Sequence, residues 1–142
     1  RGFEMKKIIV LILIISFYGC AKTSTLTTKK LFNAEQLNAL DQPIIYPTQQ
    51  PAQVSSVVRV LKPGEETGWH KHMVPLHAYV MEGTLSIDFE IDGLIQTETF
   101  SKGEAWIGAV DVWHNAFNRT DQPAAIMVVV MGADGLKNTI NR

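Results

Sequence analysis

The stretch GEETGWHKHMVPLH, residues 64–77, carries three of the four histidines of this chain, namely His70, His72 and His77. The fourth, His114, lies in the stretch GEAWIGAVDVWHNAFN, residues 103–118. His70 and His72 are two residues apart in a β-rich region, so their side chains should leave one face of a strand roughly 7 Å apart. A third imidazole from the distant stretch would complete a facial set and leave positions open for water or substrate. The clustering predicts one metal site.

Short extended segments surround both histidine stretches from about residue 43 onward. Residues 84–91 alternate apolar with polar side chains, and Asp92-Gly93, a preferred pair for a tight hairpin turn, joins them to a second alternating segment. Closely spaced strands with glycine, proline and aspartate turns are typical of an antiparallel sandwich or small barrel. The fold class expected is therefore all-β, with strands over 54–61, 77–82, 84–91, 94–100, 105–107, 112–118 and 124–131.

Residues 60–132 resemble a single-domain cupin. The first motif of that family is Gly, five residues, His-x-His, three or four residues, Glu, six residues, Gly, and Gly64, His70, His72 and Gly83 stand at these spacings. The second motif is matched by Gly103, His114 and Asn118, although Ala109 and Asp111 replace its proline and glycine. The resemblance implies a double-stranded β-helix, or jelly-roll barrel, with the hairpin over 84–100 in the variable region between the motifs.

The sequence departs from the family at the glutamate of the first motif, because Leu76 occupies that position. His77 is the next residue, and on strand parity it shares a face with Tyr79 and Met81, away from the site. Pro75 interrupts the strand just before it, and a local bulge there would turn His77 inward. Two interpretations follow: His77 is a fourth ligand, or it is a partly exposed strand histidine.

The predicted metal ligands are His70, His72 and His114, with His77 as the alternative fourth. Imidazole binds Fe, Mn, Zn, Ni and Cu, so the residue types predict a divalent transition metal without selecting one. Three neutral imidazoles leave the full charge on the ion, which favours anionic, chelating ligands. The competing interpretation is a barrel without metal, whose histidines are hydrogen-bonding residues of a pocket.

Two functions follow from these observations. The first is a metal-binding cupin that takes a small polar or anionic molecule and acts on it as a dioxygenase or isomerase. The second is a non-catalytic cupin that binds or senses a small ligand, and the missing glutamate and the lack of a convincingly placed general base favour it. A structural envelope component is a third, weaker interpretation. Fold resemblance alone does not choose between them.

Other residues allow both a structural and a functional interpretation. Trp69, Trp106 and Trp113 flank the motif histidines and form either a pocket wall or simple core. Asn118 is expected in a structural turn or as a hydrogen-bonding residue behind the site, and not as a catalytic residue. The outward-facing Tyr79 and Met81, together with the apolar strand over 54–61, are candidates for a homodimer contact.

The first twenty residues are expected to be a leader. Met5-Lys6-Lys7 precedes an apolar run over 8–17, which is too short to span a bilayer and is typical of a secretory signal. Cys20 follows it, as at the lipidation site of bacterial lipoproteins. We therefore expect export to the periplasm or anchoring in the outer membrane through Cys20, a linker over 21–42 with at most a short helix over 31–40, and a cupin domain over 43–142.

Length and composition limit the number of domains, the class of ligand and the possible disulfides. The chain has 142 residues, 46% of them hydrophobic, which is enough for one domain with one core. Its 13 basic and 14 acidic residues offer no basic surface of the kind that binds a phosphate backbone, so we expect a small-molecule ligand and no nucleic acid. Cys20 is the single cysteine, which excludes an intrachain disulfide.

Overall fold

Short strands make up the regular structure of this computed structural model, which describes residues 28–48 and 50–142. The strands are β1 (Ala52–Leu61), β2 (His70–His72), β3 (Leu76–Glu82), β4 (Thr84–Ile91), β5 (Leu94–Ser101), β6 (Ala105–Ile107), β7 (His114–Phe117), β8 (Ala124–Ala133) and β9 (Thr139–Asn141). No helix occurs within these described residues. The predicted all-β class is confirmed.

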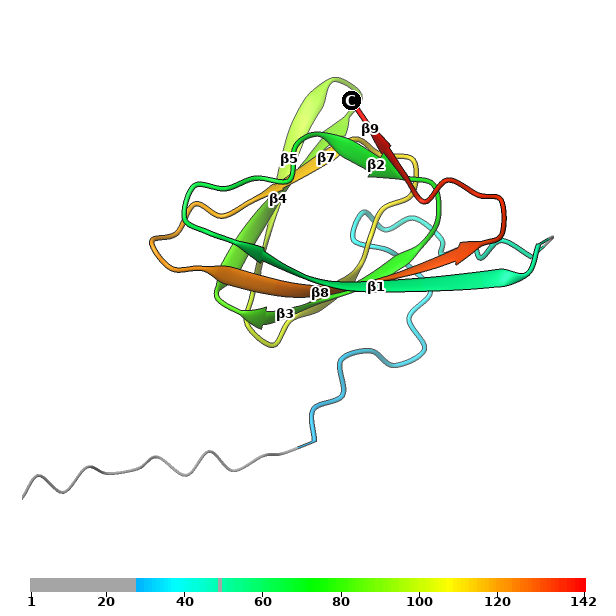
Figure 1. Ribbon diagram of the computed structural model, residues 1–142, viewed down its shortest axis with the longest axis horizontal. Helices are drawn as coiled ribbons and strands as arrows, with labels where there is room; N and C mark the ends of the chain where they lie inside the picture. The colour runs from blue at the N-terminus through cyan, green and yellow to red at the C-terminus, as the bar shows by residue number, and fades with distance from the viewer. Residues whose placement is uncertain (1–27, 49) are drawn as a thin grey trace, which may run out of the picture.

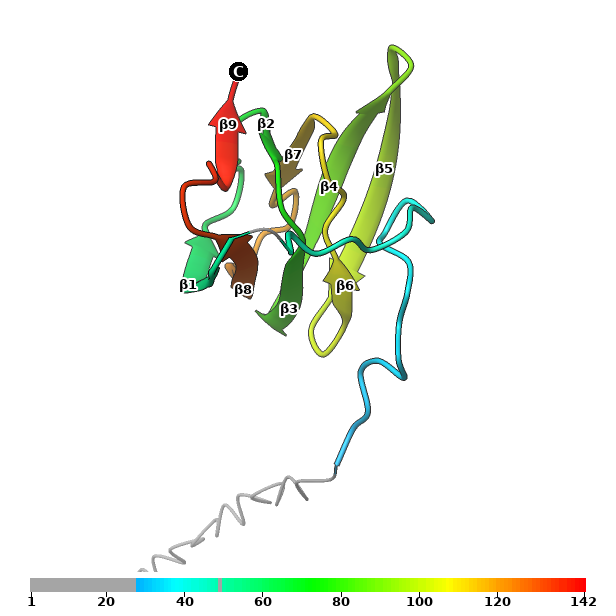
Figure 2. The same cartoon turned by 90° about the vertical axis from the view of Figure 1, so that its right-hand side faces the viewer.

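Two antiparallel sheets face each other (Figure 1). One sheet has the strand order β1-β8-β3-β6, and the other has the order β5-β4-β7-β2-β9. The side view in Figure 2 shows the β4–β5 hairpin extending beyond the shorter strands. The strand order interleaves segments that are distant in the sequence, so β2 and β7, the two histidine-bearing strands, become neighbours. This is the jelly-roll arrangement expected from the motifs.

The core fills the space between the two sheets. Alternate residues of β4 point inward, and Leu85, Ile87 and Phe89 are each at most 3% exposed. Across from them, β3 contributes Ala78 and Val80, which are fully buried. The polar residues that alternate with these three along β4 lie on the opposite face. The alternating pattern therefore has one buried face and one solvent-facing face, as the sequence predicted.

Two tight turns depend on backbone conformations that few residues adopt. Asp92 and Gly93 have φ values of 50° and 77°, which is the left-handed pair that a two-residue hairpin needs. Gly83 links β3 to β4 with φ at 73°, and a Cβ there would lie 2.5 Å from the carbonyl oxygen of Pro123. The last glycine of the first motif therefore coincides with a position that a larger residue would strain.

The segment before β1, in which at most a short helix was expected over 31–40, forms no helix. Instead, Leu37 bridges Pro43, and the Asn38 side-chain oxygen accepts hydrogen bonds from the amides of Leu40 and Gln42 at 2.9 and 3.1 Å. An asparagine that satisfies the backbone locally competes with helix formation. The amide of Ala39 donates to the carbonyl oxygen of Ile107, which attaches this segment to β6.

The structure does not test the predicted leader or the predicted homodimer. The leader and Cys20 lie outside the described residues. Within the described ranges, none of the segments forms a helix with the length and apolar character needed to cross a bilayer. The homodimer stays a prediction as well, although β1 is an edge strand on which Val54, Val58 and Val60 are more than half exposed.

Candidate metal centre

Three histidines meet on the inner side of the five-stranded sheet. His70 in β2 is the direct antiparallel partner of His114 in β7, and side chains at such paired positions are neighbours on one face. His72 shares that face because it is two residues further along β2. One ring nitrogen from each histidine lies within 4.8 Å of those of the other two. The structure thus brings together the three residues of the predicted ligand set.

Hydrogen bonds at Nδ1 fix the orientation of these rings. Nδ1 of His70 lies 2.8 Å from the carbonyl oxygen of Gly68, and Nδ1 of His114 lies 2.9 Å from that of Val112. A carbonyl only accepts, so both Nδ1 atoms donate, and in the neutral rings Nε2 keeps its lone pair. Nδ1 of His72 is 3.0 Å from the hydroxyl of Thr139. Partners at the second ring nitrogen are typical of histidines that hold a metal.

Burial keeps the three imidazoles neutral. Desolvation lowers the pKa of His72 to about 4, and the neighbouring His114 and His70 add to this effect. Desolvation likewise lowers the pKa of His114 to about 4, against the opposing effect of the Val112 carbonyl. The pKa of His70 is lowered by burial and, to a lesser degree, by the positive charge of Arg59. At neutral pH the cluster therefore presents unprotonated nitrogens, the form that binds metal ions.

His77 is not part of this cluster. Its half-buried ring packs edge-on against Phe32, with the ring centroids 5.4 Å apart. Leu76, the preceding residue, is buried and lines the pocket. The β3–β8 pairing does contain a register shift, but it falls between Val80 and Glu82, too late in β3 to turn His77 inward. The regular alternation of the strand therefore sends the side chain at 77 outward.

The histidines open onto a cavity of about 260 Å³ between the two sheets. This is below the roughly 300–1,000 Å³ of sites that take drug-sized ligands, so the cavity suits a small molecule. The four-stranded sheet supplies an apolar wall, and the five-stranded sheet supplies the histidines and most of the uncharged polar groups. The apolar side chains of that wall are Val57, Leu76, Ala78, Trp106, Ile126, Val128 and Val130.

Several residues of the pocket were missed by sequence reasoning. Arg59 lines it from β1, and Thr139 and Asn141 line it from β9. Arg59 carried a signal, because Val57, Arg59 and Leu61 alternate along one face of the expected strand and Leu61 is a core residue. Thr139 and Asn141 carried none, because β9 reaches the site only by pairing with β2.

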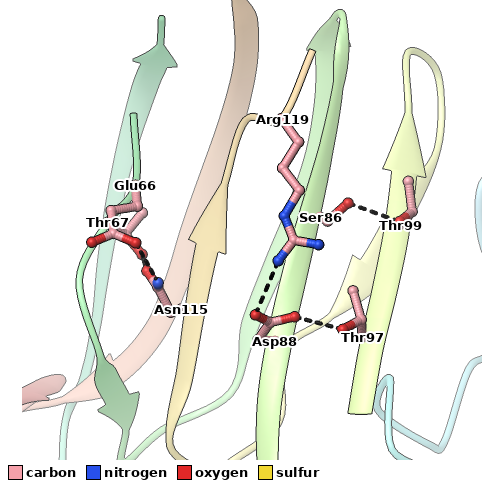
Figure 3. Close-up of polar contacts among 8 residues, drawn as sticks. All are labelled: Glu66, Thr67, Ser86, Asp88, Thr97, Thr99, Asn115 and Arg119. Atoms are coloured by element: carbon pink, nitrogen blue, oxygen red, sulfur yellow. Dashed lines mark hydrogen bonds and ion pairs between the residues drawn. The ribbon is translucent and has the colours of Figure 1, made fainter. Parts of the chain in front are cut away.

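Hydrogen bonds of Glu66 and Thr67 with β7, here called the polar bracket, hold the segment before β2 against that strand. The Asn115 amide donates to the Glu66 carboxylate at 2.8 Å, and the side-chain oxygen of Asn115 lies 3.3 Å from the Thr67 hydroxyl, as Figure 3 shows. The same hydroxyl accepts a hydrogen bond from the amide of Ala116 at 3.0 Å. Since this segment leads directly into His70, the bracket fixes the approach of β2 to β7. Glu66 therefore has a structural contact in addition to its exposure to solvent.

Of the three tryptophans, Trp106 belongs to the pocket wall and the core, and the other two do not. Trp106 is 7% exposed, stacks on Phe100 with centroids 4.2 Å apart and also lines the pocket, so it is both core and wall. Trp69 and Trp113 instead lie next to the guanidinium of Arg142, at 5.8 and 5.2 Å. These two contacts help to hold the residues after β9 beside the histidine strands.

A set of three neutral imidazoles suits a divalent transition metal. Nitrogen ligands of this kind bind Zn, Mn, Fe, Ni and Cu, whereas Ca and Mg prefer oxygen. No carboxylate is found among the residues that line the cavity in the described part of the chain. A bound ion would accordingly keep its full charge, as expected from the loss of the glutamate at Leu76.

The comparisons with known proteins agree with this architecture. The family model for the cupin domain matches residues 57–130. The chain belongs to the cupin family. The match includes β2 and β7, so the three histidines of this cupin lie inside the matched region. No curated protein matches the chain.

Solved structures similar to this cupin include two oxalate decarboxylases and a lyase. The Lactobacillus farciminis oxalate decarboxylase, in complex with formate, is 19% identical with a TM-score of 0.54, and the match covers 62% of this chain and 26% of that one. The Bacillus subtilis enzyme, whose Mn(II) centres have been studied, is 16% identical with a TM-score of 0.54, over 72% and 30% of the two chains. The DMSP lyase DddQ from Ruegeria pomeroyi is 15% identical with a TM-score of 0.51, over 62% and 42%.

These similarities concern the fold. The cupin spans about a quarter to a third of the length of the two oxalate decarboxylases. Different activities on related barrels illustrate that the side chains in the cavity, and not the barrel, determine the chemistry.

Proposed function

We propose that this cupin holds one divalent transition metal ion at His70, His72 and His114 and binds a small anionic molecule beside it. The observation that carries the proposal is the set of Nδ1 hydrogen bonds, which leaves an unprotonated Nε2 on His70 and on His114 for the ion. Thr139 orients the third ring through its hydroxyl. When bound, the ion would supply a localised positive charge that polarises an oxygen of the ligand.

Two variants of this function are distinguished by their treatment of the ligand. A dioxygenase or isomerase converts it, whereas a binding or sensing protein releases it unchanged. The second is favoured by the absence of aspartate, glutamate, lysine and tyrosine among the described residues lining the cavity, which leaves no obvious proton acceptor besides the histidines. Product analysis by NMR, after incubation of the metal-loaded protein with a carboxylate in air, separates the two.

Metal stoichiometry measured on protein without an affinity tag is the direct test. We expect close to one ion per chain after equilibration with Zn(II) or Mn(II) and removal of the excess. Because the pKa values of His72 and His114 are lowered to about 4, these rings stay neutral at pH 5. Because burial also lowers the pKa of His70, metal affinity should fall by less than about thirtyfold between pH 7 and pH 5, whereas three histidines at the usual pKa of about 6.5 would lower it more than a thousandfold.

Two results would contradict this proposal. A protein that retains no ion at pH 7 is a barrel in which the histidines are only pocket residues. A steep loss of metal between pH 7 and pH 6 would contradict the burial of the two rings as the cause of their neutrality.

We further propose that the cupin works at the cell envelope. The support is the lysine-flanked apolar run over 8–17 followed by Cys20. Membrane fractionation of a Cys20→Ala variant tests lipid attachment, and we expect the variant to move from the membrane to the soluble or periplasmic fraction. A variant that stays in the membrane as firmly as the wild type would show that this thiol is not the anchor.

A further inference from the structure

Arg59 occupies a distinctive position on the wall of the cavity. It lies on β1, two residues after Val57, and both residues line the same cavity as the histidines. Their antiparallel partners on β8, Ile126 and Val128, line it as well. Val57 and Arg59 are also exposed to solvent, so β1 forms the open side of the cavity. The arginine is thus placed where a ligand would enter.

The charge of Arg59 has no counterpart in the cavity. Among the described residues that line it, Arg59 is the only one with a permanent charge. The other two arginines in the described ranges form ion pairs, Arg119 with Asp88 at 3.6 Å and Arg142 with Glu90 at 2.7 Å. Within those same ranges, Arg59 has neither a hydrogen-bonding nor an ion-pair partner for its guanidinium. A guanidinium facing a hollow with no internal acid is suited to bind an anion from outside.

The apolar side chains of the four-stranded sheet limit which groups the anion can carry besides the one that binds Arg59. Leu76, Ile126, Val128 and Val130 present only hydrocarbon to the cavity, together with the ring of Trp106. A second anionic group pressed against these side chains would lose its hydration without gaining a partner. A short hydrocarbon group would instead be stabilised there, by about 0.8 kcal/mol for each buried methylene.

We propose that Arg59 anchors the carboxylate of the ligand, and that the ligand class is a small monocarboxylate with a short apolar body. The guanidinium on one sheet and the histidine-held ion on the other attract the same anionic group, while the hydrocarbon part lies on the β3–β8 wall. This inference deepens the proposed function and rests on it. It selects against ligands that would place a second anionic group against that wall.

Binding of butyrate and of its neutral isostere butyramide, followed by NMR titration of the metal-loaded protein, tests the anchor. We expect Arg59→Gln to weaken butyrate binding by about tenfold to a hundredfold, the range for a charge-assisted hydrogen bond, and to leave butyramide unaffected. Arg59→Lys should recover part of the loss. Arg119→Gln is the matched control, because it removes the same charge from the outer side of β4, where Figure 3 shows its pairing with Asp88. Equal butyrate affinity in Arg59→Gln and wild type would overturn the proposal.

A chain-length series tests the apolar body. From acetate to butyrate two methylenes become buried, so affinity should rise about fifteenfold. A flat series would show that the wall does not receive the ligand.

Metal content, measured on the same samples, separates failure of this inference from failure of the metal site. Arg59→Gln is expected to retain the metal stoichiometry of the wild type. If the wild type holds no metal, the proposed function fails, and the Arg59 dependence is then judged on butyrate binding to the metal-free protein. Loss of metal from Arg59→Gln would contradict the role of Arg59 as a ligand anchor, since the arginine would then act on the histidines instead of the ligand.

Discussion

His114→Ala is expected to abolish stoichiometric metal binding and to weaken the affinity for Zn(II) at least a hundredfold. His114 is the one ligand candidate from β7, and its ring lies 4.4 Å from that of His70 and 5.1 Å from that of His72, centroid to centroid. In metal sites, removing a residue that only hydrogen-bonds to a ligand already lowers metal affinity by about tenfold to a hundredfold. Removing a ligand itself should lower the affinity further. Elemental analysis and competition with a chromophoric chelator measure the change.

His77→Ala is the matched control for this experiment. It also removes one imidazole, but from a ring that packs on Phe32 outside the cluster. We expect it to keep one ion per chain, and circular dichroism should confirm that both variants are folded. Equal metal content in His114→Ala and wild type would refute a shared site, and metal loss in His77→Ala would restore that residue as a ligand.

Asn118→Ala is expected to destabilise the fold by about 3 kcal/mol and to lower Tm by about 10 °C. Asn118 is 1% exposed, and its amide group donates to the carbonyl oxygens of Leu61 and Gln122 at 3.0 and 2.7 Å. Its side-chain oxygen accepts from the amide and the hydroxyl of Thr120. Alanine would leave buried polar groups without partners at the point where the end of β1 meets the turn before β8. Urea unfolding followed by tryptophan fluorescence measures the loss.

An exposed asparagine provides the comparison for that variant. Asn33 lies on the surface, where its side chain accepts a hydrogen bond from Lys30, and Asn33→Ala should change stability by less than about 0.5 kcal/mol. If Asn118→Ala were as mild, the hydrogen bonds of this turn would not be what holds β1 and β8 together there.

Features that depend on local sequence could be predicted. The β4–β5 hairpin needed only an alternating pattern and Asp92-Gly93, and both are local. His70 and His72 share a face because any two residues at that spacing in a strand do. The family resemblance then placed His114 opposite them, which spacing within one strand could not have done. Asn118, expected in a structural turn or behind the site as a hydrogen-bonding residue, follows β7 and makes hydrogen bonds to Leu61, Thr120 and Gln122.

Features that depend on distant pairing could not be predicted in the same way. Thr139 reaches His72 only because β9 joins the sheet beside β2, and nothing in residues 132–142 identifies that partner. No helix forms over 31–40, where at most a short one was expected, because Asn38 satisfies nearby amides with its side chain, a competition that apolar spacing does not reveal. Arg59 was overlooked although its alternation with Val57 and Leu61 indicated the face on which it lies, because the cavity that this face lines is built from strands distant in the sequence.

The pairing of β9 with β2 also links two properties of the protein. β2 pairs with β7 at one residue pair, His70 with His114, and with β9 at three. Apart from the bridge between His72 and Val110, the backbone that carries the two histidines therefore depends largely on residues 139–141. Arg142 holds that strand through Glu90 and the rings of Trp69 and Trp113. Fraying of this short ribbon and release of an ion would therefore be thermodynamically coupled, each making the other easier.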